Sequence, residues 1–267
     1  VLVDLQLAGR RAVVTGGSRG IGLAVAESLL DEGTDVALVA RDVAVLDAAV
    51  ASLRGRAGRA VAIPADTTDD GSVRAMAQRA TELLGGVDIL VNTAARPATP
   101  GPRPPLTEIT DDALRAELET KVLGYLRCAR ALAPGMVERG WGRIVNISGL
   151  NARSASSLVG SVRNVAVAAM TKNLADELGP AGVNVTVVHP GFTVTERTPD
   201  TLAAVAADRG VTAEQVAADI AKGLSIGRLV TAAEVASVVT FLASPRSVAI
   251  TGDAVAAGGG QVGPIYY

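Results

Sequence analysis

The sequence is poor in several residue types, and each shortage excludes a class of protein. Its 267 residues include one cysteine, Cys128, and one histidine, His189, so neither an internal disulfide nor a Cys/His zinc site can form. No apolar run reaches the roughly 18 residues that a membrane-spanning helix needs, and the first residues lack the basic start of a secretory signal. The 25 basic and 27 acidic residues are interleaved, which does not favour nucleic acid or an acidic membrane as a partner. We therefore expect a soluble, cytoplasmic protein without a bound metal.

Lysine and tyrosine are also scarce, so candidate proton donors of these two types can be counted. The three lysines are Lys121, Lys172 and Lys222, and the three tyrosines are Tyr125, Tyr266 and Tyr267. No tyrosine has a lysine four residues further on, since Tyr125 leads to Ala129 and the other two are the last residues of the sequence. The sequence therefore contains no Tyr-x-x-x-Lys.

Short apolar runs alternate with longer segments that are rich in alanine and leucine. The runs predict strands at residues 12–15, 35–39, 61–63, 88–91, 143–147 and 183–188. The longer segments predict helices at residues 21–32, 46–50, 72–84, 111–138, 162–178 and 232–242. Short, wholly apolar strands that alternate with helices are typical of a parallel sheet covered on both faces. We expect one α/β domain, residues 1–267, built on a doubly wound, Rossmann-like parallel sheet of about seven strands.

Two segments depart from this alternation. The proline-rich stretch at residues 97–105 cannot form a regular helix and predicts a stiff surface loop. Residues 193–227 follow a strand and contain two short helical patterns, at 202–207 and 213–221. Because ligands bind beyond the carboxyl ends of the strands in such sheets, we expect this insertion to form a lid over the substrate.

A glycine-rich turn, TGGSRGIG at residues 15–22, directly follows the first expected strand and opens the first expected helix. Glycine permits a left-handed backbone and lets N–H groups come close to a pyrophosphate, whose charge a helix N-terminus favours. This strand–turn–helix context predicts a dinucleotide site. Its expected contacts are Gly16, Ser18, Arg19, Gly20, Ile21 and Gly22.

The TGxxxGIG spacing resembles that of the classical short-chain dehydrogenase/reductase family, and further motifs similar to that family's follow in order. They are Asp-Thr at 66–67, Asn-Thr-Ala-Ala at 92–95, the strand Ile-Val-Asn-Ile-Ser at 144–148, Pro-Gly-x-x-x-Thr at 190–195, and glycines at 252 and 258–259. The resemblance implies a nicotinamide dinucleotide, a small-molecule substrate and a homodimer or homotetramer. It adds as expected cofactor contacts Asp66, Thr67, Asn92, Ala94, Pro190, Gly191 and Thr193.

The end of the second expected strand bears on which dinucleotide binds. NAD-preferring enzymes usually place an acidic residue there for the ribose 2′-hydroxyl, whereas this chain has Ala40 and Arg41. Arg41 and Arg19 together can hold a 2′-phosphate through charge-assisted hydrogen bonds. Asp42 follows one position later and keeps NAD(H) open. We expect NADP(H) to be favoured over NAD(H).

The family's catalytic residues, in contrast, are absent from their usual positions. In the family a tyrosine exchanges a proton with the substrate, a lysine lowers its pKa, a serine polarises the carbonyl and an asparagine on the preceding helix holds a water. Aligning the helix that follows the family's lysine puts Asn164 at the lysine position and Gly160 at the tyrosine position. The serine position falls on Gly149, beside Ser148, and Lys121 takes the place of the asparagine. The resemblance therefore implies a rebuilt acid–base group.

Lys121, Tyr125, Ser148 and Asn164 are the candidates for that group. Lys121 and Tyr125 lie four residues apart on one expected helix, so they share a face, and a buried lysine with a lowered pKa can donate a proton. Tyr125 can equally be a core or interface residue, and Lys121 can equally pair with a carboxylate such as Glu117. Ser148 can donate to a carbonyl oxygen or satisfy the end of its own strand.

Other polar residues near these positions have open roles. His189, directly before Pro190, is expected to be structural and not a general acid. Arg153, Arg163 and Asn164 can bind an anionic substrate or reshape a water network, and no pattern in the sequence ranks them.

Three functions are open at this point. We favour an NADP(H)-dependent oxidoreductase that transfers hydride to or from a carbonyl, an alcohol or a similar substrate. The second is a cofactor-binding protein without dehydrogenase activity, such as a sensor or pseudoenzyme. The third is a non-redox enzyme on the same fold, such as a lyase, isomerase or dehalogenase. The glycine-rich turn disfavours the dehalogenase, since such relatives usually lose it and keep the tyrosine.

Overall fold

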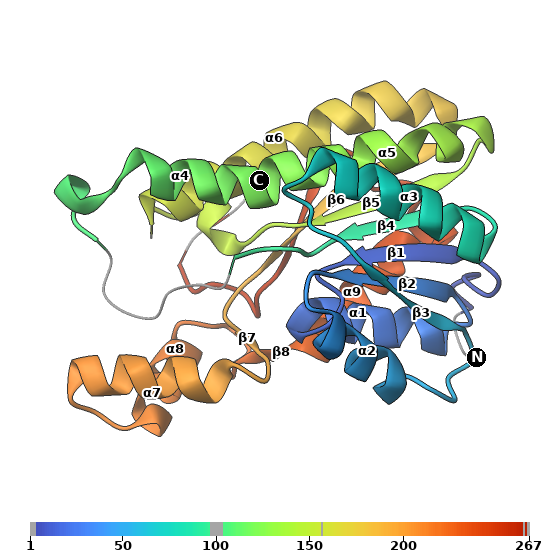
Figure 1. The fold of residues 1–267 in the computed structure, drawn as a ribbon. Helices are drawn as coiled ribbons and strands as arrows, with labels where there is room; N and C mark the ends of the chain where they lie inside the picture. The colour runs from blue at the N-terminus through green and yellow to red at the C-terminus, as the bar shows by residue number, and fades with distance from the viewer. Residues whose placement is uncertain (1–3, 97–103, 156, 264, 266–267) are drawn as a thin grey trace.

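A seven-stranded parallel sheet forms the centre of the computed structural model, which describes residues 4–96, 104–155, 157–263 and 265 (Figure 1). Its strand order is β3-β2-β1-β4-β5-β6-β9. These strands are β1 (Arg11–Thr15), β2 (Asp35–Ala40), β3 (Ala60–Pro64), β4 (Ile89–Asn92), β5 (Gly142–Ile147), β6 (Val183–Pro190) and β9 (Ala254–Ala257). The chain runs outward from β1 to β3 and then from β4 to β9, so the prediction of a doubly wound sheet is confirmed.

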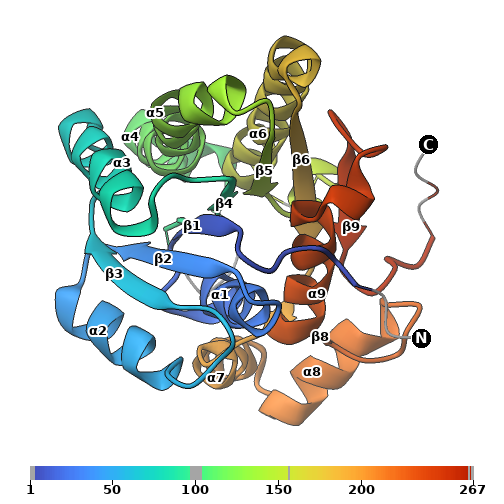
Figure 2. The ribbon, with the colours of Figure 1, turned by 90° about the vertical axis from the view of Figure 1, so that its right-hand side faces the viewer.

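Helices cover both faces of the sheet (Figure 2). One face carries α1 (Gly20–Asp31), α2 (Val43–Ser52) and α9 (Ala232–Ala243), and the other carries α3 (Asp70–Leu84), α5 (Gly124–Glu138) and α6 (Leu158–Leu178). Successive strand residues point to opposite faces. On β1, Val14 packs in the core under α1 and α9, and Val13 packs in the core under α3 and α5. Burial on both faces explains why the strands are apolar throughout.

The segment predicted to be one helix over residues 111–138 is divided into three. α4 (Asp111–Glu117) and α5 are α-helical, whereas residues Leu118–Leu123 between them form a π-helical turn that contains Lys121. The single-helix prediction is wrong here, because apolar periodicity does not register a local change in hydrogen-bond spacing. A π turn is wider than an α turn, and such turns are frequent at functional sites.

Helix α6 begins earlier than its apolar pattern predicts, at Leu158 and not at residue 162. Ser157 is the N-cap, and its hydroxyl accepts a hydrogen bond from the Gly160 N–H at 3.2 Å. A cap of this kind satisfies an N–H group that would otherwise have no partner, and so it allows the helix to start there.

The residues between β6 and α9 form a small substructure of their own. β7 (Thr193–Val194) pairs in parallel with β8 (Val230–Thr231), and α7 (Thr198–Arg209) and α8 (Ala213–Lys222) lie between them in the chain. Figure 1 shows α7 and α8 set off from the main sheet. Both predicted helical patterns in this region are confirmed.

Short 3-10 turns complete the connections, at Leu106–Glu108, Leu150–Ala152, Gly179–Ala181 and Pro245–Ser247. The stiff loop predicted at residues 97–105 lies mostly outside the described residues. Within the described ranges, none of the helices combines the length and apolarity needed to span a bilayer.

A line of buried polar side chains, here called the polar line, connects the carboxyl ends of β1, β4 and β5 to α6. Asn92 accepts from the Thr15 hydroxyl at 3.4 Å and donates to Oδ1 of Asn146 at 2.9 Å. Asn146 donates to the Thr171 hydroxyl at 3.0 Å, which donates to the Val167 carbonyl at 2.8 Å. Buried amides and hydroxyls need such partners because water does not reach them. The polar line therefore fixes these three strand ends relative to one another.

Replacing Asn146 tests the contribution of the polar line. Asn146→Ala leaves the Asn92 amide without its acceptor and Thr171 without its donor, and it opens a cavity. We expect a loss of about 3 kcal/mol in the free energy of unfolding, measured by urea denaturation. Asn173→Ala, on the exposed face of α6, is the matched control and should change it by less than about 0.5 kcal/mol. Equal losses in the two variants would contradict this role.

Candidate active site

The glycine-rich turn packs so closely against the loop after β4 that side chains are excluded from it. Gly16 has φ +68°, and a Cβ there would lie 2.9 Å from the backbone of Ala94. A Cβ on Gly22 would lie 2.3 Å from the Gly16 carbonyl oxygen. Both positions therefore require glycine, and this contact holds the turn at the end of β1.

The N-terminus of α1 binds an anionic group of the chain itself. The Gly20 N–H donates to the carboxylate of Glu196 at 3.1 Å, and the N-cap residue Arg19 supplies no side-chain cap. A negative charge is stabilised at a helix N-terminus by the exposed N–H groups and the helix dipole. The close-packed glycine-rich turn and the N–H groups at the start of α1, one of which binds this carboxylate, form a set of donors that fits the pyrophosphate of a dinucleotide. The sequence reasoning missed Glu196, although it directly follows the Pro-Gly-x-x-x-Thr motif.

A cavity of about 790 Å³ extends from this helix N-terminus past the ends of β2 and β3. It is lined by three carboxylates, those of Asp42, Asp66 and Glu196, and by four arginines, Arg19, Arg41, Arg96 and Arg197. The side chain of Asp42 caps α2. Burial works against the charged form of Asp66, but hydrogen bonds from Thr68 and the charge of Arg41 outweigh it and lower its pKa below the usual value. The cavity thus combines four arginines with carboxylates that already have partners.

Most of the predicted cofactor contacts meet in two adjoining cavities that have six lining residues in common: Gly16, Arg19, Thr93, Ala95, Arg96 and Thr195. The first is lined by Gly16, Ser18, Arg19, Gly20, Arg41, Asp66, Thr67 and Ala94. The second, of about 870 Å³, is lined by Ile21, Gly22, Pro190, Gly191 and Thr193, and also by Lys121, Ser148 and Asn164. Asn92 lines neither cavity, because its side chain belongs to the polar line.

Lys121 brings an ionisable amine to the wall of the second cavity. Its side chain is buried, and its Nζ donates to the Ser148 carbonyl oxygen at 2.8 Å, just beyond the end of β5. Burial lowers the pKa of the amine to about 7; the positive charge of Arg163 also lowers it, and Glu117 acts in the opposite direction. An amine with a pKa near neutrality can both hold and release a proton under physiological conditions.

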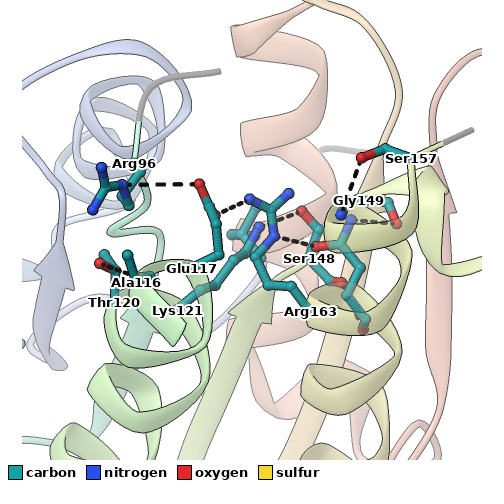
Figure 3. A network of polar contacts seen from close by, with 12 residues as sticks. Arg96, Ala116, Glu117, Thr120, Lys121, Ser148, Gly149, Ser157 and Arg163 are labelled. Atoms are coloured by element: carbon teal, nitrogen blue, oxygen red, sulfur yellow. Dashed lines mark hydrogen bonds and ion pairs between the residues drawn. The ribbon is translucent and has the colours of Figure 1, made fainter. Parts of the chain in front are cut away.

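Glu117 pairs with arginines and not, as one interpretation of the sequence had it, with Lys121. Figure 3 shows its carboxylate between Arg96 and Arg163. Nη1 of Arg163 donates to one carboxylate oxygen, and Nε of Arg96 lies 4.0 Å from the other. Nε of Arg163 also donates to Oδ1 of Asn164 at 3.2 Å. Sequence spacing alone suggested that Lys121 pairs with Glu117. The lysine instead donates to the Ser148 carbonyl just beyond β5, and Glu117 pairs with Arg163 and Arg96.

Tyr125 lies in the core, away from both cavities. Its hydroxyl donates to the Ile147 carbonyl oxygen at 3.0 Å, and its ring packs with Val167 and Val187. Burial raises the pKa of the hydroxyl far above its usual value. The position of Tyr125 therefore supports the core role and not the catalytic one, although it shares a helical segment with Lys121.

The positions aligned with the family's serine and tyrosine are glycines that adjoin asparagine side chains. A Cβ on Gly149 would lie 2.9 Å from Nδ2 of Asn164, and one on Gly160 would lie 2.9 Å from Nδ2 of Asn151. The hydroxyl of Ser148 donates to the backbone carbonyl of Asn164 at 3.1 Å, which ties the end of β5 to α6. Ser148 and Asn164 thus bond to each other, and Lys121 supplies the ionisable group of this wall.

His189 is buried within β6, where its backbone pairs with Ala256 of β9. Among the described residues its Nδ1 has no hydrogen-bond partner. Burial, together with the charges of Arg153 and Lys121, lowers its pKa to about 4, so the ring is neutral at physiological pH. It lines neither cavity, in keeping with the structural role expected for it.

The pKa of Lys121 should make stability depend on pH. The amine has a pKa of about 7 in the folded protein and an ordinary pKa of 10.5 when water surrounds it. Between these two pH values the unfolded chain binds more protons than the folded protein. The free energy of unfolding should therefore rise with pH from about 7 to 10.5. Lys121→Met should abolish that rise and should stabilise the protein most at pH 7 and below, where the buried amine is charged. Urea denaturation at a series of pH values measures this. Lys172→Met, at an exposed lysine, is the control; a rise that persists in Lys121→Met would contradict the assignment.

Known proteins are similar to this chain over nearly its whole length. The model of the short chain dehydrogenase family matches residues 10–206. The short-chain reductase protein NovJ of Streptomyces niveus is 36% identical over 253 residues, covering 94% of this chain and 93% of that protein. The 3-oxoacyl-[acyl-carrier-protein] reductase FabG of Vibrio cholerae is 32% identical over 267 residues, covering 96% and 99%. L-sorbose reductase from Gluconobacter frateurii, solved with NADPH and L-sorbose, has a TM-score of 0.90 and 30% identity, covering 98% of this chain and 100% of that one. The chain therefore belongs to the short-chain dehydrogenase family.

Proposed function

We propose that this protein is an NADP(H)-dependent oxidoreductase that reduces a carbonyl group or oxidises the corresponding alcohol, with Lys121 exchanging the proton. Membership of the family supports NAD(P)-dependent oxidoreductase activity. The proposal that Lys121 is the proton donor is supported by its buried amine, which lines the second cavity and has a pKa of about 7. Tyr125, whose hydroxyl bonds to the backbone in the core, is not placed for this role.

The first cavity supplies the groups that would hold the dinucleotide. The N–H groups at the start of α1 would bind its pyrophosphate, and Arg19 and Arg41 would bind a 2′-phosphate. Asp42, the alternative ribose ligand, is engaged as the cap of α2, which favours NADP(H) over NAD(H). The L-sorbose reductase complex with NADPH supports the same preference. When bound, the nicotinamide supplies or accepts the hydride.

Lys121 would protonate the carbonyl oxygen during reduction and take a proton from the alcohol during oxidation. One N–H group of its ammonium is held by the Ser148 carbonyl, which fixes the amine at the cavity wall. The ammonium has two further N–H groups to offer. Proton transfer is most efficient when the pKa of the donor is close to the working pH. Ser148 and Asn164, which bond to each other, would shape this wall and position the amine.

Residues 193–227 would form the lid of the substrate site. Ile220, Gly223 and Leu224, at the end of α8 and just beyond it, line the second cavity. Glu196 connects the start of the segment to α1 through its bond to Gly20. A segment that touches both cavities is placed to respond to ligands in either of them.

A homodimer or homotetramer, which the family resemblance implies, is supported by an apolar face on α6. Leu158, Val162 and Val165 are 48%, 44% and 49% exposed. Their spacing of three and four residues places them on one side of the helix. Apolar side chains gathered on an exposed face are typical of surfaces that associate.

A cofactor-binding protein without turnover is the second candidate function. It is favoured by Gly149 and Gly160, which present no side chain at the positions aligned with the family's serine and tyrosine. Both candidates require dinucleotide binding, so binding and hydride transfer must be measured separately.

Arg41→Ala tests the cofactor preference. We expect the Kd for NADPH to rise by about tenfold or more, because a charge-assisted bond to phosphate is lost, and the Kd for NADH to stay nearly unchanged. Fluorescence titration of the reduced cofactors measures both. Arg54→Ala, at an exposed arginine outside the cavity, should alter neither value. Equal effects on NADPH and NADH would refute the role of Arg41.

Lys121→Met tests the proton donor. Turnover of a panel of ketones, aldehydes and alcohols, followed by NADPH absorbance, should fall by about 10²- to 10⁴-fold in kcat, while NADPH binding persists. The parent protein should lose reductive activity as pH rises through about 7, because the amine loses its proton.

Two controls separate the possible outcomes. Lys172→Met should keep full activity, and Tyr125→Phe should keep kcat within a few-fold while losing stability. Activity that survives in Lys121→Met would exclude the lysine as donor. NADPH binding by the parent without turnover of any substrate would favour the second candidate function.

A further inference from the structure

The second cavity is rich in positive charge. Four of its lining residues are cationic: Arg19, Arg96, Lys121 and Arg163. None of the described residues that line it is an aspartate or a glutamate. A cavity lined by charges of one sign concentrates ligands of the opposite sign. The cavity therefore favours an anionic ligand over a neutral one of the same shape.

Three of these cations surround a single carboxylate, that of Glu117 (Figure 3). Glu117 is bonded to Arg163 and lies 4.0 Å from Arg96, whereas Lys121 is bonded to a backbone carbonyl. When Lys121 is protonated, the cluster holds three positive charges and one negative charge. The side chains of Arg163 and Glu117 are only 19% and 20% exposed, so water screens the excess charge incompletely. A further anion would offset it.

Arg163 is the cation best placed to receive that anion. Its Nη1 donates to Glu117 and its Nε donates to Asn164, while its Nη2 has no partner in the described part of the chain. The planar guanidinium offers paired N–H groups that match the two oxygens of a carboxylate. Arg163 and Lys121 line the same cavity, so a ligand bound to the arginine has the amine within its own site.

We propose that the substrate carries a carboxylate in addition to its reacting carbonyl, and that this carboxylate binds Arg163 and displaces Glu117 from it. The assignment rests on the proposed function and narrows its reaction to oxo acids and the matching hydroxy acids. Glu117 occupies the position at the arginine that the substrate takes, so Arg163 keeps an anionic partner before and after binding.

The bound carboxylate also affects the proton on Lys121. The positive charge of Arg163 lowers the pKa of that amine. Glu117, displaced from Arg163, keeps Arg96 as its partner and stays within the cluster. The substrate carboxylate is then a second negative charge there, which offsets the effect of Arg163 and raises the pKa of the amine, so more of the amine is protonated at neutral pH. The protonated amine is the form that can deliver a proton to the carbonyl oxygen. A neutral ketone binds without this change, so substrate charge promotes both binding and proton transfer.

The first experiment compares 2-, 3- and 4-oxo acids with their methyl esters, which keep the carbonyl and lose the charge. We expect kcat/KM to be at least about tenfold higher for the best acid than for its ester, mainly through KM. The fall of activity at high pH should occur at a higher pH for the acid. Arg163→Gln should remove the difference, and Arg163→Lys, which keeps the charge, should retain part of it. Arg130→Gln, at an exposed arginine of α5, is the matched control and should preserve it.

The second experiment measures binding without turnover. Butyrate and butyramide are titrated into the complex of the protein with NADPH, with cofactor fluorescence as the signal. Butyrate should bind at least about tenfold more tightly than butyramide, and Arg163→Gln should abolish the preference. Glu117→Gln should tighten butyrate binding, because it removes the competing carboxylate. Weaker butyrate binding in Glu117→Gln would overturn the displacement.

The two experiments distinguish failure of this assignment from failure of the proposed function. If neutral ketones are reduced and acids are not preferred, in turnover or in binding, the carboxylate assignment is wrong and the reductase function stands. If NADPH binds and nothing is reduced, the reductase function is wrong, and the preference for butyrate over butyramide still decides whether Arg163 forms an anion site.

Discussion

The buried hydrogen bonds of the polar line constrain everything that lies beyond the carboxyl ends of β1, β4 and β5. Asn92 and Asn146 have no access to water, so sliding one strand along another would leave their amides without partners. The strand ends are thereby fixed, and with them the points from which Gly16 and Ser148 emerge into the site. The glycine-rich turn and the wall that holds Lys121 both depend on this alignment.

The two cavities share a feature that the fold alone does not require. A lining group of each cavity that suits an anionic ligand bonds to a carboxylate of the chain: the Gly20 N–H to Glu196, and Arg163 to Glu117. Such a carboxylate offsets the positive potential of the site and pairs with one of its donors without any ligand. An incoming anion then exchanges one negative partner for another. The affinity of such a site for an anionic ligand depends on how much more strongly the donors bind the ligand than they bind the carboxylate of the chain.

The sequence predicted features that depend on residues close together in the chain, and it missed contacts between residues that are far apart in the chain. The apolar strands and the glycine-rich turn are local patterns, and they predicted the sheet and the first cavity. The pairing of Glu117 with Arg163 joins distant segments, so spacing along one helix suggested the wrong partner. The bond between Gly20 and Glu196 is longer in range still. The π turn at Leu118–Leu123 was missed because a search for apolar periodicity does not detect a local change in hydrogen-bond spacing.

Lys121 and Tyr125 show that burial acts in opposite directions on the pKa of an amine and the pKa of a phenol. Both side chains are buried, both donate to backbone carbonyls at the end of β5, and burial is the main influence on both pKa values. A tyrosine becomes an anion when it loses its proton, so burial holds the proton in place unless a cation lies close by. A lysine becomes neutral when it loses its proton, so burial and the nearby Arg163 both promote the loss. In a cavity lined by arginines, burial and the charge of Arg163 together bring the pKa of the amine near neutrality, although Glu117 acts in the opposite direction.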